Sequence, residues 1–317
     1  MNFEIDEQQR DFASSIDAAL SAADVPAAVR AWAAGDTAAG RKVWAQLADL
    51  GVTALLVPEK YDGIDAHPVD LVVALERLGY WAVPGPVTES IAVAPILLAD
   101  DERAAALAAG ELIATVALPP SVPRAVNADV AGLTLLAADG QVSDASAGAA
   151  HDSVDPTRKL FDVTASGAAR PADTARAYEF GVLATAAQLV GAGQAMLDQS
   201  VEYAKQRTQF GRIIGSYQAL KHKLADVHIA VELARPLVYG AALALAEGSP
   251  DTARDISAAK VAAADAALLA ARNSLQTHGA IGFTQEHDLS LLLLRVQALR
   301  SAWGDPTLHR RRLLEAL

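Results

Sequence analysis

The 317-residue sequence predicts a mainly α-helical protein with a small β domain. Two observations support this fold class. Apolar residues recur at helical spacing in both terminal parts of the chain, and short alternating or β-branched segments lie between them. The composition, 52% hydrophobic and 20% charged, allows a sizeable core. We therefore expect an N-terminal helical domain (residues 1–112), a small middle β domain (113–170) and a C-terminal helical bundle (171–317).

The N-terminal part is rich in alanine and leucine at helical spacing, interrupted by short breaks such as VPEKYDG and AVPGPV. One helix is expected over residues 36–50, with an N-cap at Asp36 or Thr37 and Gly51 at its C-terminal end. A second is expected from Pro68 to residue 78, ended by Gly79.

The middle part has a different period. IATVAL, GLTLLA and KLFDVTA are short strand-like segments separated by Pro-Pro, Asp-Gly and Asp-Pro turn signals. The stretch between Gly140 and Asp155 is rich in alanine, serine and glycine, which predicts a loop.

The C-terminal part is helical again. A 3-4 spacing of apolar residues predicts one long helix with a narrow apolar seam, in which Pro236 should cause a kink. Further helices are expected over residues 252–276 and 286–301, and long helices with such seams pack as a bundle. The seam consists of Tyr217, Leu220, Leu224, Val227, Val231, Ala234, Val238, Ala241 and Leu245.

Composition also excludes several classes of function. The net charge of -12 and the pI near 5.0 disfavour nucleic acid as a partner. Cysteine is absent, no apolar run approaches the roughly 20 residues that span a bilayer, and the acidic N-terminus lacks the features of a secretory signal. The histidines form no i, i+4 pair, so no metal site is predicted. We expect a cytoplasmic protein without a membrane partner.

The first candidate site is the segment EYAKQRTQFGRIIGSYQALKHKLADV, residues 202–227. Arg207, Gln209 and Phe210 are grouped where one long helix stops and another starts. They fit an ordinary helix C-terminus, with Phe210 in the core and Gly211 as the cap. They also fit a diphosphate site, with the Arg207 guanidinium as the anion ligand.

The second candidate is LQTHGAIGFTQEHDL, residues 275–289. Two glycines interrupt one helix, and Thr284 can cap the next. The segment fits a plain helix–helix connection. Alternatively, Gly279 lets the backbone approach a ligand closely and Gln276 offers a side-chain amide.

These two segments, together with LADLGVTALLVPEKYDG near the N-terminus, resemble the acyl-CoA dehydrogenase family over almost the whole chain. The resemblance implies an N-terminal helical domain, a middle β domain and a C-terminal four-helix bundle, with FAD at a subunit interface. Ala280 stands where the family usually has a second glycine. The implied contacts to the adenosine-diphosphate half of FAD are Arg207, Gln209, Phe210, Gln218, Gln276, Gly279 and Ala280.

The chain departs from the family at the catalytic base, a carboxylate that removes the α-proton of the acyl-CoA. Trp303 occupies the usual position of this base, and Gly181 occupies the position used by other members. Glu179 and Asp305 lie nearby, but Asp305 precedes Pro306 and is better placed as a helix cap. The middle segment is also short, and the family's flavin-binding motifs are absent from it.

The resemblance therefore implies a subunit of a heteromeric, FAD-dependent acyl-CoA dehydrogenase, similar to the short subunits of actinobacterial sterol side-chain degradation. A longer partner subunit would carry the catalytic glutamate, and an electron-transferring flavoprotein would accept the electrons. One alternative is a self-sufficient homotetramer with Asp305 or Glu179 as base. The other is a flavin-free helical scaffold.

Overall fold

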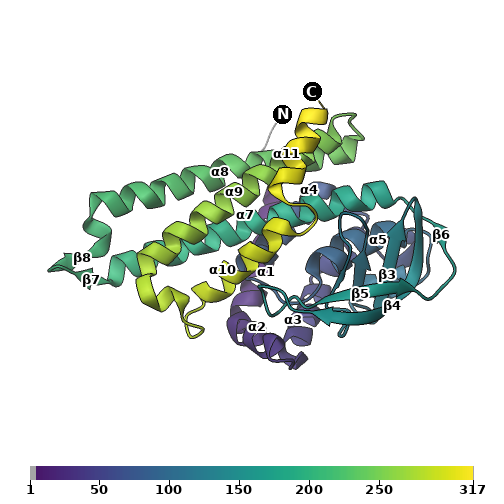
Figure 1. Ribbon diagram of the computed structural model, residues 1–317, viewed down its shortest axis with the longest axis horizontal. Helices are drawn as coiled ribbons and strands as arrows, with labels where there is room; N and C mark the ends of the chain where they lie inside the picture. The colour runs from purple at the N-terminus through teal and green to yellow at the C-terminus, as the bar shows by residue number, and fades with distance from the viewer. Residues whose placement is uncertain (1–4, 317) are drawn as a thin grey trace.

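The computed structural model describes residues 5–316 and has three parts (Figure 1). The first consists of helices, 3₁₀ turns and one π-helix, Thr88–Val93. Its 3₁₀ turns are Val52–Ala54 and Glu59–Tyr61. The N-terminal α-helices are α1 (Glu7–Ala22), α2 (Val25–Ala33), α3 (Ala38–Asp49), α4 (Pro68–Tyr80), α5 (Ala94–Leu97) and α6 (Ala104–Ala108).

The helix predicted over residues 36–50 is confirmed as α3. The Asp36 carboxylate accepts a hydrogen bond of 3.0 Å from the Ala38 amide, whereas Thr37 makes no side-chain cap. Gly51 follows the helix with φ +77°, the left-handed conformation that glycine adopts without strain.

The predicted end of α4 at Gly79 is wrong, because the helix continues to Tyr80. Gly79 instead lies at a contact with α7 (Thr174–Gln206), where a Cβ atom would stand 2.2 Å from the Gln188 carbonyl oxygen. Gly191 of α7 meets α4 in the same way, since its Cβ would lie 1.8 Å from the Glu76 carbonyl oxygen. Both glycines serve close helix packing rather than termination.

The middle part is a small sheet with the strand order β1-β3-β4-β5-β2, in which β6 also pairs with β4. Strands β1 and β3 are parallel and the other pairs are antiparallel. The strands are β1 (Ala114–Ala117), β2 (Ala125–Val126), β3 (Leu133–Ala138), β4 (Gln141–His151), β5 (Leu160–Ala165) and β6 (Arg170–Pro171).

The loop predicted between Gly140 and Asp155 is wrong over most of its length, because β4 occupies residues 141–151. The first half of β4 pairs with β3 and the second half with β5. Side chains in the second half are mostly exposed, so backbone pairing rather than apolar burial defines this part of the strand. A strand of this kind lacks the hydrophobic alternation that sequence reasoning depends on.

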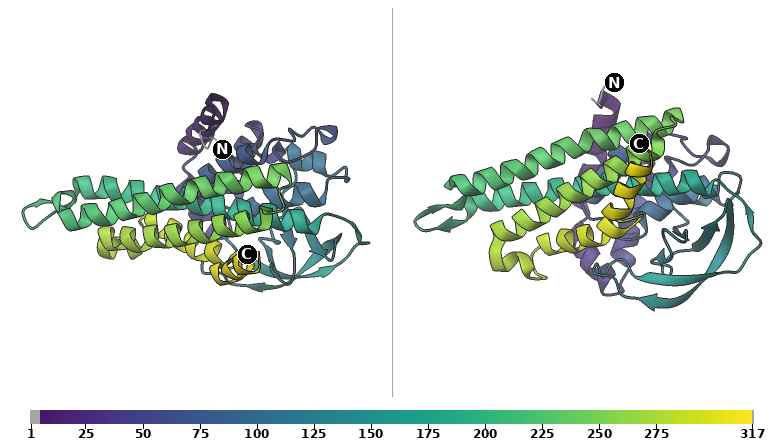
Figure 2. Two further views of the ribbon diagram at one scale, coloured as in Figure 1. Left: turned by 90° about the horizontal axis from the view of Figure 1, so that it is seen from above. Right: turned by 45° about the horizontal axis from the view of Figure 1, so that its top comes forward.

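The C-terminal part is a helical bundle. Helices α7, α8 and α9 run lengthwise beside one another, and the hairpin β7–β8 projects from one end (Figures 1 and 2). The remaining elements after α7 are β7 (Thr208–Gln209), β8 (Arg212–Ile213), the 3₁₀ turn Ile214–Ser216, α8 (Gln218–Glu247), α9 (Thr252–His278), the 3₁₀ turn Gly279–Phe283, α10 (Leu289–Ser301) and α11 (Pro306–Glu315).

The apolar seam predicted on α8 is buried from Val227 onwards, while its first members, at the hairpin end, are half-buried. The helix continues through Pro236 without a break. Thr284 does not cap α10, which begins three residues later than expected. The His287 imidazole accepts the Leu289 amide hydrogen bond there instead.

By length and composition alone, α7 and α8 could each cross a membrane. The apolar window of α7 is 94% buried inside the protein, however, and that of α8 is 44% buried. A core helix of a globular bundle meets the same criterion, so the two helices are weak evidence for a membrane span.

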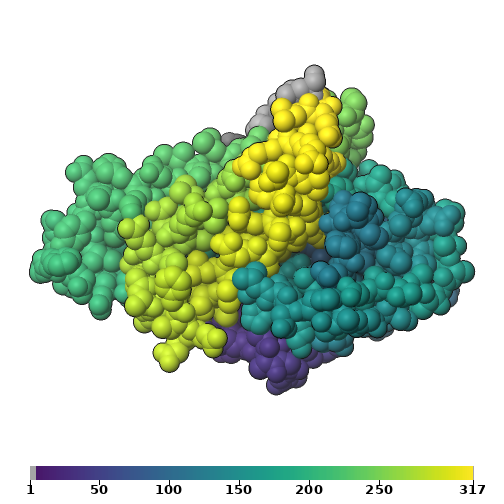
Figure 3. Space-filling model, in the orientation of Figure 1, coloured from purple at the N-terminus to yellow at the C-terminus, as the bar shows by residue number. Residues whose placement is uncertain are grey.

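One buried arginine joins the three parts of the molecule. Arg295 of α10 pairs with Asp155 at 2.6 Å, donates to the Thr157 hydroxyl at 2.9 Å and donates to the Val83 carbonyl at 2.9 Å. These contacts hold the bundle against the loop before β5 and against the N-terminal part. The space-filling view shows the C-terminal helices directly against the β region (Figure 3).

Candidate functional site

The two positions predicted for a catalytic base lie against each other. Trp303 is 1% exposed, and its indole ring packs on Gly181 of α7. A Cβ atom at Gly181 would lie 2.3 Å from Trp303 Cε3, so the ring leaves no room for a side chain there. A single indole therefore excludes a carboxylate from both positions.

The loop that carries Trp303 is held by hydrogen bonds to its backbone. The Trp303 carbonyl accepts from the Tyr178 hydroxyl at 3.2 Å and from His309 Nε2 at 2.9 Å. The other ring nitrogen of His309 lies 3.2 Å from the Ser257 hydroxyl. Burial lowers the pKa of His309 to about 4, so the ring is neutral and donates through Nε2 at physiological pH.

The two other carboxylates considered as bases have structural partners. Asp305 is exposed and accepts the Leu308 amide at 2.8 Å, the N-cap of α11 that the sequence predicted. Glu179 is mostly buried and forms an ion pair with Arg312 of α11. Burial raises the pKa of Glu179, and Arg312 opposes this effect. Neither carboxylate lines the cavity beside Trp303.

A third carboxylate does line this cavity, and sequence reasoning missed it. Glu89 belongs to the π-helix and is 1% exposed. One oxygen, Oε1, accepts the Trp303 indole N–H at 3.1 Å and lies 3.7 Å from Arg158 Nη2. A signal was present in the sequence, because Glu89 is a single carboxylate near the start of an otherwise apolar stretch, and a buried glutamate usually has a partner.

The cavity beside Trp303 has a volume of about 350 Å³. Loops of the sheet form one side and α10 with the Trp303 loop forms the other. Its lining residues are Glu89, Ser121, Val122, Pro123, Arg124, Val126, Asp152, Ser153, Val154, Arg158, Leu160, Ala298, Ser301, Ala302 and Trp303. The walls are mainly apolar, with the Glu89–Arg158 pair buried among them.

The structure places the Arg207 group on the projecting hairpin. Arg207 follows the last residue of α7, Gln209 lies in β7, and Phe210 and Gly211 form the turn with φ values of +52° and +77°. Phe210 is 92% exposed, so the interpretation of this residue as core is wrong. Gln218 is the exposed first residue of α8.

The second predicted group lies at the same end of the bundle. Gln276, in the last turn of α9, accepts a hydrogen bond from Lys223 of α8, and the Tyr203 ring of α7 stacks on His278 at 4.4 Å. Gly279 has φ +65°, and no atom lies within 4 Å of the position that its Cβ would occupy. Ala280 is exposed. The backbone at this turn is thus open to a ligand or another chain.

The bundle end is also positively charged, although the whole chain is acidic. Its exposed or half-exposed cations come from α7, the hairpin and α8, and they are Lys205, Arg207, Arg212, Lys221 and Lys223. Lys205 is paired with Glu202 at 2.5 Å. Arg207, Arg212, Lys221 and Lys223 remain as an excess of positive charge at this open end, which suits a polyanionic group such as a diphosphate.

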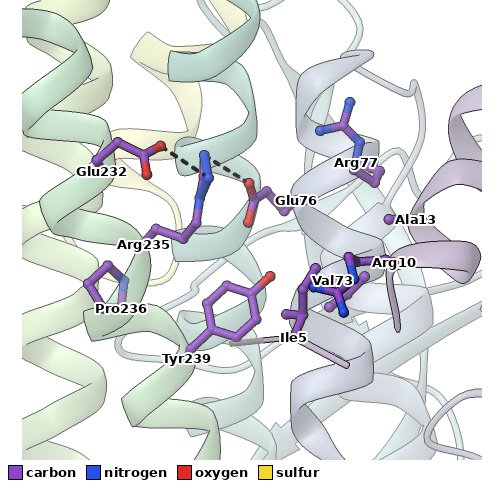
Figure 4. A pocket seen from close by; sticks show the side chains of 10 residues that line it. All are labelled: Ile5, Arg10, Ala13, Val73, Glu76, Arg77, Glu232, Arg235, Pro236 and Tyr239. Carbon is purple, nitrogen blue, oxygen red and sulfur yellow. Dashed lines mark ion pairs between the residues drawn. The ribbon is translucent and has the colours of Figure 1, made fainter. Parts of the chain in front are cut away.

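A larger cavity, about 560 Å³, lies between α1, α4 and α8 (Figure 4). Arg235 points into it between two carboxylates, 3.3 Å from Glu76 and 3.2 Å from Glu232. Burial raises the pKa of Glu76 even though Arg235 lies beside it. Sequence analysis singled out none of these residues, and their close pairing fits a structural role.

Comparison with known proteins identifies the class. Residues 6–103 match the acyl-CoA dehydrogenase N-terminal domain, and residues 175–317 match the acyl-CoA dehydrogenase C-terminal domain. Acyl-CoA dehydrogenase IpdE2 of Mycobacterium tuberculosis is 32% identical over 295 residues, which are 91% of this chain and 90% of IpdE2. The chain belongs to the acyl-CoA dehydrogenase family, whose members are FAD-dependent oxidoreductases.

Two further relatives differ in organisation. Acyl-CoA dehydrogenase FadE34 of Mycobacterium tuberculosis is 32% identical over 314 residues, which cover 90% of this chain but 44% of FadE34. The crystal structure of the ChsE4-ChsE5 complex from Mycobacterium tuberculosis superposes with a TM-score of 0.84 at 22% identity, covering 99% of this chain and 98% of the other. This likeness shows that the fold is shared.

The described residues fit one half of the family cofactor. Arg207 and Gly279 offer an exposed guanidinium and an open backbone near a cationic bundle end, as a diphosphate requires. At the other end of α7, the ring of Trp303 packs on Gly181, and these are the two positions predicted for the base.

Proposed function

We propose that this chain is the non-catalytic subunit of a heteromeric acyl-CoA dehydrogenase that carries out the α,β-dehydrogenation of an acyl-CoA. A longer partner subunit supplies the catalytic glutamate and the flavin-ring site. FAD supplies the hydride acceptor when bound, and an electron-transferring flavoprotein takes up the electrons. The packing of Trp303 on Gly181 is the observation that carries the proposal.

A dehydrogenase of this family needs a carboxylate beside the α-carbon of the substrate. In this chain the Trp303 indole occupies position 303 and covers Gly181, the two positions at which relatives of different types would carry this carboxylate. The remaining candidates, Asp305 and Glu179, are engaged as a helix cap and as an ion pair. A chain without a base can take part in this reaction only in a complex with another subunit that supplies the base.

The contribution of this chain is contact with the diphosphate half of FAD. Arg207 donates to the phosphate oxygens, and Gln209, Phe210 and Gln218 flank it on the hairpin and on α8. Gln276, Gly279 and Ala280 add an amide and open backbone at the same bundle end. The positive charge and exposure of this end support the assignment.

The organisation of relatives supports a partner subunit. ChsE4 and ChsE5 form a complex, and FadE34 extends well beyond the part that this chain matches. By analogy with these proteins and with IpdE2, the substrate is a sterol-derived acyl-CoA and the complex is cytoplasmic.

The test is to purify the chain alone and together with longer acyl-CoA dehydrogenases encoded near it. We expect the lone chain to be colourless and inactive, and the complex to show the visible absorbance of bound flavin and to oxidise an acyl-CoA. Full flavin content and turnover of the lone chain would sink the proposal.

Two substitutions separate the alternatives. Arg207→Ala in the complex should weaken FAD binding, with Arg310→Ala as the control because Arg310 is an exposed arginine outside the cationic bundle end, paired with Asp265. Unchanged FAD affinity in Arg207→Ala would favour a flavin-free scaffold. Asp305→Asn keeps the helix cap, since asparagine caps as well as aspartate, and abolishes turnover only if Asp305 is the base of a self-sufficient enzyme.

A further inference from the structure

Arg158 is a buried guanidinium with one unpaired nitrogen. Its side chain is 4% exposed, and Nη1 has no hydrogen-bond partner within residues 5–316. The nearest carboxylate, that of Glu89, lies 3.7 Å away, which is longer than a hydrogen bond. Glu89 balances the charge of Arg158, but a buried N–H donor without an acceptor is costly, so Nη1 calls for an additional partner.

The Glu89 carboxylate has the opposite deficiency, an acceptor oxygen without a donor. Its Oε1 accepts from the Trp303 indole, but its buried Oε2 has no donor among the described residues. Both Arg158 and Glu89 line the cavity of about 350 Å³ beside Trp303. The cavity thus presents an unused donor and an unused acceptor next to each other.

The rest of the cavity limits what can complete this pair. Val122, Val126, Val154 and Leu160 contribute apolar walls. The other arginine of the lining, Arg124, already pairs with Asp162 at 2.9 Å. Small-molecule sites typically combine such apolar walls with a few convergent polar groups in a volume of about 300–1,000 Å³.

The complementary group must accept from Arg158 and donate to Glu89. A carboxylate meets only the first requirement and places a negative charge beside Glu89. A carboxamide meets both without adding charge, because its C=O accepts and its N–H donates. We propose that the cavity beside Trp303 binds a small, mainly apolar molecule through a carboxamide. This site goes beyond the proposed dehydrogenase role, because neither flavin nor the partner subunit is needed for it.

Three probes of one shape test the site on the full-length chain. Cyclohexanecarboxamide has the donor and the acceptor, its N,N-dimethyl derivative lacks the donor, and cyclohexanecarboxylate is an anion without a donor. Isothermal titration calorimetry should show saturable binding of the carboxamide, at least about tenfold tighter than the other two, the usual effect of one unpaired buried group. Equal affinities for the three, or no binding of the carboxamide, would overturn the proposal.

Two variants assign the contacts. Glu89→Gln removes the negative charge and adds an N–H donor, so cyclohexanecarboxylate should gain at least about tenfold in affinity. Arg158→Met should abolish carboxamide binding, and Arg254→Gln, at a partly exposed arginine of α9, should leave it unchanged. An unchanged preference in Glu89→Gln contradicts the assignment. If Arg158→Met does not fold, the affinities of the three probes for the wild type and for Glu89→Gln still test the proposal. The readout is binding without flavin, so its failure leaves the dehydrogenase proposal intact.

Discussion

The Trp303 side chain occupies one of the two positions predicted for a catalytic base and packs against the other, Gly181. Its ring needs the space that a side chain at Gly181 would fill, and its indole N–H needs an acceptor, which Glu89 provides. The three residues therefore depend on one another. Restoring a glutamate at position 303 alone would leave Gly181 exposed to an empty space and Glu89 without its donor.

We predict that Gly181→Ala lowers the free energy of unfolding by about 1–3 kcal/mol, because the new methyl group overpacks the Trp303 ring. The double variant Gly181→Ala with Trp303→Ala should lose less than the sum of the single changes, since the clash is gone. Urea unfolding measures both. Gly193→Ala, in the same helix with its Cβ 3.3 Å from Val231, is the control and should have little effect. Additive losses would contradict the packing argument.

Lys260 of α9 is fully buried, and its amine donates to the Leu299 carbonyl at 2.6 Å. Burial lowers the pKa of Lys260 well below its usual value, and Arg158 and Arg300 lower it further. Because the unfolded chain binds the proton more tightly, this residue makes the protein less stable as the pH falls below 10.5.

Between pH 8 and pH 10, Lys260 should therefore make the free energy of unfolding in urea experiments rise with pH, by up to about 1.4 kcal/mol per pH unit. We expect Lys260→Met to lose this contribution and to be more stable than the wild type at neutral pH. Lys205→Met, at an exposed lysine, corrects for the loss of one charge. Parallel pH curves for the wild type and Lys260→Met would refute a lowered pKa.

The hairpin β7–β8 is the element that departs most from a simple helical bundle. Its two-residue turn places Phe210 and Gly211 at positive φ, the type I′ geometry that matches the twist of paired strands. A phenylalanine in this conformation is strained and, at 92% exposure, gains nothing from burial. Retention of such a residue fits a contact with a cofactor or another chain.

Phe210→Asn tests this interpretation, because asparagine accepts positive φ. The free energy of unfolding of the chain should rise by about 1 kcal/mol, while FAD retention by the heteromeric complex falls. Phe283→Asn is a matched control at another exposed phenylalanine, with 73% exposure, and should not gain stability. Stabilisation without any loss of FAD would show that the ring makes no cofactor contact.

At the scale of the whole molecule, the Arg295–Asp155 pair holds the bundle, the sheet and the N-terminal helices together. Removing one partner leaves a buried charge unpaired, so Asp155→Ala should cost about 3–5 kcal/mol. Asp155→Ala combined with Arg295→Met should recover part of this loss. Asp265→Ala breaks the exposed pair with Arg310 and should cost less than about 1 kcal/mol. Denaturant unfolding of the four proteins is the measurement.

Much of this molecule could be predicted from its sequence. The fold class, the small sheet and α3 follow from local patterns, because apolar periodicity and glycine at a helix end act over a few residues. The capping role of Asp305 is equally local. The resemblance to the acyl-CoA dehydrogenases adds the family, which the domain matches show.

The errors have a common physical cause. The helix end predicted at Gly79 is wrong because this glycine is needed for close packing on α7, at Gln188, more than 100 positions away in the sequence. The loop predicted in place of β4 is wrong because backbone hydrogen bonds to β3 and β5, rather than an apolar pattern, hold this segment as a strand. Glu89 was missed because its partners, Trp303 and Arg158, come from other parts of the chain.

The sequence, through its resemblance to the family, predicted that the usual carboxylate is missing, because positions 303 and 181 hold tryptophan and glycine. Only the tertiary structure decided what replaced it. One indole covers both positions, and a buried donor and acceptor remain beside it in a cavity. The reason is that shape complementarity and hydrogen-bond pairing between distant segments depend on the packed chain, whereas residue type does not.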